Sequence, residues 1–65
     1  MNKKQLINLL VKFYGKASFN AGHLYKDHRG WVFAPFGFND RVLGANIADA
    51  CELVEMWLDQ LEGVQ

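Results

Sequence analysis

Three side chains in this sequence are of the kinds that bind metal ions or act as nucleophiles: His23, His28 and Cys51. A zinc site needs closely spaced pairs of cysteine or histidine ligands that converge on one point. His23 and His28 are five positions apart across a predicted hairpin, and no second ligand pairs with Cys51, even with Asp27 added. We therefore expect no metal site and no cofactor.

A cysteine nucleophile would also need a histidine base within hydrogen-bond reach and a third group to orient that base. Cys51 falls on the face of a predicted helix that should be buried, where it acts as a small hydrophobic residue. The 65 residues are few for an enclosed pocket, and the sequence has no phosphate-binding glycine loop. We predict that the protein is not an enzyme.

The clearest pattern is a row of acidic residues near the C-terminus, with Met56 among them. At a helical 100° per residue the acids fall within an arc of about 140°. Such an acidic face could bind a basic groove or imitate nucleic acid, and the simpler interpretation is a solvated helix face. The row consists of Asp49, Glu52, Glu55, Asp59 and Glu62.

A second pattern mixes basic and aromatic residues in the middle of the chain: Lys26, Arg29, Trp31 and Arg41. On a sheet, this combination can bind single-stranded nucleic acid by stacking and phosphate contacts. Trp31 and Phe33 share one strand face, however, and that bulkier face is better suited to cover helices.

Elements of secondary structure follow from apolar spacing and turn residues. Residues 3–14 have the 3.6-residue period of a helix, with an apolar arc of about 200° that is too wide for a single contact. Asn46 is a suitable N-cap for a second helix over residues 47–61, with Ile47, Ala50, Cys51, Val54, Leu58 and Leu61 toward the core.

The middle of the chain is predicted to be β. Residues 22–34 form a hairpin in which Gly30 supplies the left-handed conformation of the turn. A further turn at Asn39 and Asp40 precedes a strand over residues 41–44, and the role of residues 16–21 stays open. The predicted fold class is α+β in the order α-β-β-β-α, a three-stranded antiparallel meander with two helices packed on one face.

Composition indicates one small folded domain spanning residues 1–65. Residues 1–41 carry seven bases against two acids, whereas residues 42–65 carry five acids and no base. A chain with charge so divided can fold on itself, with Lys4 or Lys12 beside the acidic row, pair with a copy of itself, or bind a charged partner. No segment approaches the roughly 20 apolar residues of a membrane span, and the lone cysteine suits a reducing compartment, so we expect a cytoplasmic protein.

The apolar surface also exceeds what a thin core can hide, which is typical of an interface. We therefore predict a non-enzymatic protein-protein interaction module, a homodimer that acts as an adaptor or inhibitor of a larger complex, as phage or mobile-element accessory proteins do. A nucleic-acid-binding domain and a structural subunit that only self-associates are the alternatives. The predicted partner-binding residues are Phe36, Phe38, Glu52, Glu55, Met56, Trp57, Asp59 and Glu62.

Overall fold

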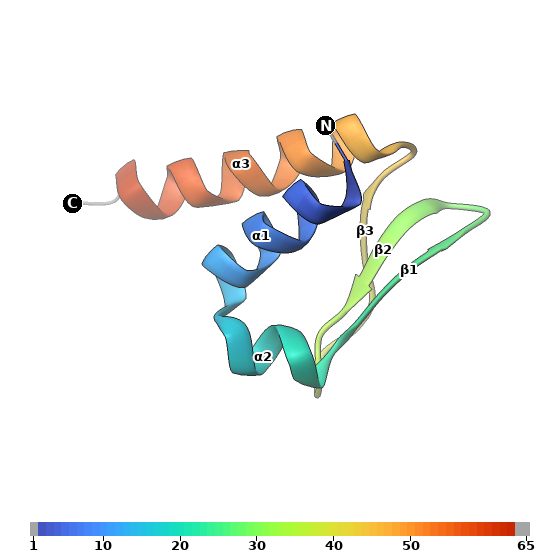
Figure 1. Ribbon diagram of the computed structural model, residues 1–65, viewed down its shortest axis with the longest axis horizontal. Coiled ribbons are helices and arrows are strands. Elements are labelled where there is room, and N and C mark those ends of the chain that lie inside the picture. Colours follow the sequence, from blue (N-terminus) through green and yellow to red (C-terminus); the bar gives the residue numbers. More distant parts are fainter. Residues whose placement is uncertain (1, 64–65) are drawn as a thin grey trace.

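The computed structural model describes residues 2–63 as three helices packed on one face of a three-stranded antiparallel sheet (Figure 1). The predicted α+β class and order are therefore confirmed, with one short helix added. Within this range no helix is both long enough and apolar enough to cross a membrane. The elements are α1 (Lys3–Tyr14), α2 (Lys16–Ala21), β1 (His23–Asp27), β2 (Gly30–Ala34), β3 (Arg41–Gly44) and α3 (Ile47–Gly63).

Side-chain caps begin both long helices. The Asn2 side chain accepts a hydrogen bond from the Gln5 backbone N–H at 2.9 Å, and the Gln5 side chain accepts one from the Asn2 backbone at 3.0 Å. This reciprocal box satisfies N–H groups that a helix start leaves without partners. At the predicted start of α3, the Asp49 backbone N–H donates to the Asn46 side chain at 2.9 Å. Asn46 is thus the cap that the sequence predicts.

The sheet has the order β1-β2-β3, and each neighbouring pair is antiparallel. Gly30 closes the β1–β2 turn at φ 108°, as predicted for the residue that ends a bulged hairpin loop. The pairing register between β2 and β3 shifts by one residue between Trp31 and Val32. Trp31 is paired with Gly44 and Val32 with Val42, so Leu43 has no partner on β2. Leu43 falls at this irregularity and is buried in the core.

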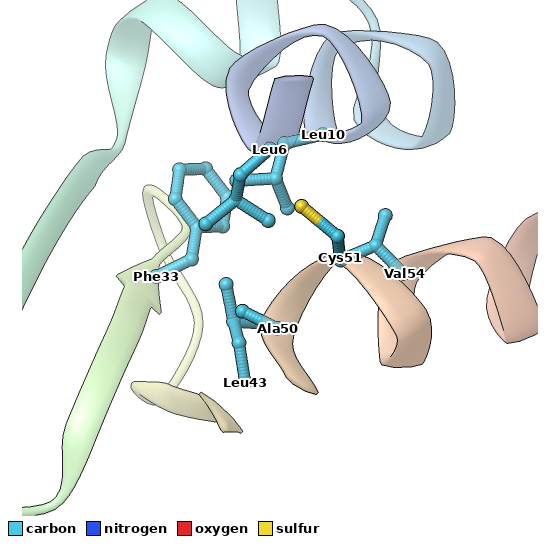
Figure 2. Close-up of a cluster of buried hydrophobic side chains, with 7 residues drawn as sticks. All are labelled: Leu6, Leu10, Phe33, Leu43, Ala50, Cys51 and Val54. Carbon is cyan, nitrogen blue, oxygen red and sulfur yellow. The ribbon is translucent and has the colours of Figure 1, made fainter. Parts of the chain in front are cut away.

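The core lies between the sheet and the two long helices, and seven buried side chains meet there (Figure 2). Phe33 reaches in from β2, as expected for the bulkier strand face, while Trp31 packs against the edge of the cluster. Most of the cluster comes from helix positions that the apolar spacing predicts. Its members are Leu6, Leu10, Phe33, Leu43, Ala50, Cys51 and Val54.

One apolar residue of α3 is not where the sequence pattern puts it, and one of β2 is more buried than its neighbours on the same sheet face. Leu61 is 57% exposed, because the end of α3 extends past α1 and the sheet (Figure 1); the prediction that it faces the core was wrong. Val32 is fully buried although it lies outside the core cluster. Its register partners Tyr25 and Val42 flank it on the sheet face away from the helices.

The connection between β2 and β3 also differs from the prediction. The chain turns at Pro35–Phe38, where the Phe38 N–H donates to the Pro35 carbonyl at 3.2 Å. Gly37 has a φ of 83°. Within residues 2–63 every residue with a positive φ is a glycine, so Asn39 and Asp40 do not have the positive φ of a tight hairpin turn. The turn predicted at Asn39 and Asp40 was therefore wrong, since Gly37 supplies the positive φ that the third position of a type II turn needs.

Candidate interaction surfaces

Phe36 and Phe38 are each 78% exposed on the loop between β2 and β3. They border a hollow of about 300 Å³ between this loop and the α1–α2 corner. A second hollow of about 320 Å³ shares three of its lining residues and extends toward Phe13 and Arg41. The two hollows together form one groove along the loop; their shared residues are Tyr14, Pro35 and Phe38.

Trp57 connects α3 to this groove. Its ring centroid lies 5.2 Å from that of Phe13, and Phe13 in turn lies 4.9 Å from Tyr14. The guanidinium carbon of Arg41 lies 5.0 Å from the Trp57 ring, which adds a cation–π contact across the groove. An aromatic band therefore runs from α3 to the exposed loop, formed by Trp57, Phe13, Tyr14, Phe38 and Phe36.

The acidic face of α3 is exposed along its whole length. Met56 lies within it at 51% exposure and borders a shallow hollow between α3 and β3. Glu52 and Asp49 line the same hollow together with the apolar Leu43 and Leu53. The structure thus groups Met56 with the acids and separates it from Phe36, Phe38 and Trp57, so the predicted partner-binding residues form two surfaces.

Helices α1 and α3 lie side by side, but the basic residues of α1 do not neutralise the acidic face. Lys12 and Glu55 line one hollow between the helices. Within residues 2–63, no ion pair joins Lys4 or Lys12 to Glu52, Glu55 or Asp59. No ion pair from α1 therefore offsets the charge of these three carboxylates in this part of the chain.

The basic residues of the hairpin do not form one surface. Arg29 is held in the β1–β2 turn, where its Nη2 lies 2.7 Å from Asp27 and 3.9 Å from Asp40. It also donates to the Tyr25 hydroxyl at 3.2 Å, and that hydroxyl donates to Asp40 at 2.6 Å. The pKa of Tyr25 is raised, mainly because its hydroxyl donates this hydrogen bond to Asp40.

Trp31 has two cations beside it. The ammonium groups of Lys3 and Lys26 each lie 5.9 Å from the Trp31 ring centroid. Arg41, the fourth residue of the predicted nucleic-acid site, contacts Trp57 instead. Only Lys26 and Trp31 of that set therefore lie together, and sequence reasoning missed Lys3 because it is distant in the chain.

The Asp27–Arg29 contact makes stability depend on pH at the acidic end. Hydrogen bonds from Arg29 lower the pKa of Asp27, so the folded state favours the ionised carboxylate. The resulting stabilisation is present above the ordinary aspartate pKa and is lost as the pH falls through the lowered value. We expect Asp27→Asn to lower the melting temperature at pH 6 and to leave it near that of the wild type at pH 2.

Thermal denaturation followed by circular dichroism at the two pH values measures this difference. Arg29→Gln removes the same contact from its other side and should show the same dependence on pH. An Asp27→Asn deficit of equal size at pH 2 and pH 6 would contradict the assignment.

The side chains considered for catalysis are apart from one another. His23 and His28 stand at the two ends of β1, the second in the turn, whereas Cys51 is buried in the core and 1% exposed. Burial raises the pKa of the Cys51 thiol, which disfavours the nucleophilic thiolate. Within residues 2–63 no three His, Cys, Asp or Glu side chains are grouped so as to hold a metal ion.

Sequence reasoning also missed that Phe13 and Tyr14 line the groove beside the β2–β3 loop. Both fit the apolar arc of α1, and the excess width of that arc was the available signal.

Comparison with protein-family models, curated proteins and solved structures finds no significant match to this chain.

Proposed function

We propose that this protein is a non-enzymatic protein-protein interaction module that binds a basic partner through the acidic face of α3. The observation that carries the proposal is the half-exposed Met56 amid carboxylates, beside the hollow lined by Leu43 and Leu53. A flexible thioether surrounded by charge is suited to enter an apolar pocket of a partner, while the acids select a basic rim. An adaptor or inhibitor of a larger complex would work in this way.

Site-specific photo-crosslinking tests this function. A benzophenone amino acid at position 56 should give, on irradiation in host cells, an adduct with a second, different protein. Glu52→Lys with Glu55→Lys should reduce that adduct at least tenfold, because the substitutions reverse the charge beside Met56. The same probe at Val42, which is 45% exposed on the opposite side of the sheet, is the matched control.

The outcomes separate the candidate functions. If position 56 crosslinks only to other copies of this chain, the proposal is contradicted, and the result favours the alternative that the protein is a structural subunit that only self-associates. Equal adducts from positions 42 and 56 would show that the acidic face has no special role.

Binding of single-stranded nucleic acid is the second candidate, and the two lysines beside Trp31 favour it. The balance of seven basic and seven acidic residues disfavours it, because nucleic-acid-binding domains are usually basic. Salt-sensitive binding of an oligonucleotide that Lys26→Ala abolishes would support this candidate over the protein-binding one.

A further inference from the structure

The hollow beside Met56 combines apolar and acidic side chains from α3 and β3. We propose that the partner presents a basic amphipathic helix, which lies along α3 with its apolar side over this hollow. The inference rests on the proposed function and adds to it the conformation and chemistry of the partner segment. The hollow measures about 300 Å³ and is lined by Leu43, Asp49, Glu52, Leu53 and Met56.

Three apolar side chains of the hollow offer a partner helix a place to pack. Met56 is 51% exposed, Leu53 is half-buried beside it on α3, and Leu43 lines the hollow from β3. Leu53 and Met56 are three positions apart, so they lie on one side of α3. An amphipathic helix packs residues i, i+3, i+4 and i+7 of its apolar side onto a surface of this kind.

The charge around the hollow favours a basic helix. Asp49 and Glu52 line the hollow, and Asp59 lies about two turns beyond Glu52 on α3. Within residues 2–63 both ion pairs are made by Arg29, and neither involves these three carboxylates. Lysine or arginine residues that flank the apolar side of the partner helix complement this charge.

The spacing of the acids matches a helix more closely than a strand. Glu52 and Asp59 are seven residues apart, which is about 10.5 Å along α3. Two bases seven residues apart on a helix that lies along α3 have the same separation. On an extended strand, side chains of one face recur about every 6.8 Å, so two such bases are about 6.8 or 13.6 Å apart and fit these carboxylates less closely.

The free edge of β3 is also poorly suited to pairing with a strand of the partner. β3 lies at one end of the sheet and, within residues 2–63, pairs only with β2. It has four residues, and the register shift leaves Leu43 without a partner on β2. Short edge strands and bulges hinder the addition of another strand. The partner segment is therefore expected to contact side chains of α3 and β3 and not the β3 backbone.

Two synthetic peptides of about 14 residues, with identical leucine and lysine content, test the proposal. The helix-period peptide has its leucines at helical spacing, whereas the alternating peptide has the period of an amphipathic strand. Fluorescence anisotropy of the labelled peptides measures their dissociation constants with the pure chain at low salt. The helix-period peptide should bind at least about tenfold more tightly than the alternating one.

Two charge reversals locate the bound peptide on α3. Glu52→Lys should weaken binding of the helix-period peptide at least about tenfold, because Glu52 lines the hollow beside Met56. Glu55→Lys changes the net charge equally, but Glu55 lines the hollow between α3 and α1. It should therefore weaken binding less than about threefold. Circular dichroism checks that both variants are folded.

Equal binding of the two peptides would overturn the proposal. So would failure of the helix-period peptide to bind below about 1 mM, or equal losses from Glu52→Lys and Glu55→Lys. These failures differ from failure of the proposed function, because the adduct from position 56 with another protein would still form if the partner segment were a strand or a loop. Absence of that adduct would contradict both.

Discussion

Phe33→Ala should remove at least about a third of the stability of the fold. Removing a buried phenylalanine costs about 3–5 kcal/mol through lost apolar burial and the cavity left behind. A domain of 65 residues has a total stability of about 3–10 kcal/mol at typical values per residue. The cost therefore ranges from about a third of the stability of the fold to all of it.

Phe33 is placed for a loss at the upper end of that range. Its side chain is fully buried, and its ring lies 5.0 Å from Tyr14 of α1 and 5.5 Å, stacked, from Phe19 of α2. Gly22 also approaches it, since a Cβ there would lie 2.9 Å from Cζ of Phe33. Phe33 thus holds both N-terminal helices against the sheet.

Thermal and urea denaturation followed by circular dichroism measure the effect. We expect the melting temperature to fall by at least about 12 °C, since 1 kcal/mol corresponds to about 4–8 °C in a domain of this size. Phe36→Ala makes the same chemical change at a side chain that is 78% exposed. It should change the melting temperature of the monomer by less than about 4 °C, because an exposed substitution usually costs under about 0.5 kcal/mol.

Both variants and the wild type are compared at one low protein concentration, where self-association contributes little to the measured stability. A decrease of less than about 5 °C for Phe33→Ala, near the value for 1 kcal/mol, would mean that Phe33 is not the centre of the core.

Gly30→Ala should have the second largest effect, and its cause is different. Gly30 has a φ of 108°, which an L side chain rarely adopts. A methyl group there would overlap the carbonyl oxygen of Gly44 and lie 2.7 Å from Cα of Ala45. Backbone strain of about 1–2 kcal/mol therefore adds to a steric overlap that only movement of β3 can relieve.

Gly37→Ala separates the two contributions. Gly37 also has a positive φ, 83°, but a Cβ there would meet nothing within 4 Å. We expect a loss of about 1 kcal/mol for Gly37→Ala and at least twice that for Gly30→Ala in urea denaturation. Equal losses would show that β3 moves freely and that the close approach of Gly30 to Gly44 adds nothing.

Local features of this protein were determined by its sequence alone. The apolar spacing of residues 3–14 and the Asn46 cap predict α1 and the start of α3, and Gly30 predicts the hairpin turn. These features depend on residues only a few positions apart, since periodicity, capping and turn geometry act over short stretches of chain.

Features that join distant parts of the chain were decided by the tertiary structure. Leu61 follows the same periodicity as Val54, yet it is exposed because the sheet and α1 end before α3 does. Arg29 and Arg41 are both basic residues of the β segment, yet one pairs with Asp27 and the other contacts Trp57.

The grouping of Trp57 with Phe13 and Phe38, and of Met56 with the acids, has the same origin. The sequence indicates which side chains are available for contact. Whether a side chain is covered depends on where the other elements end and on which residues the packing brings beside it, and helical spacing does not contain that information.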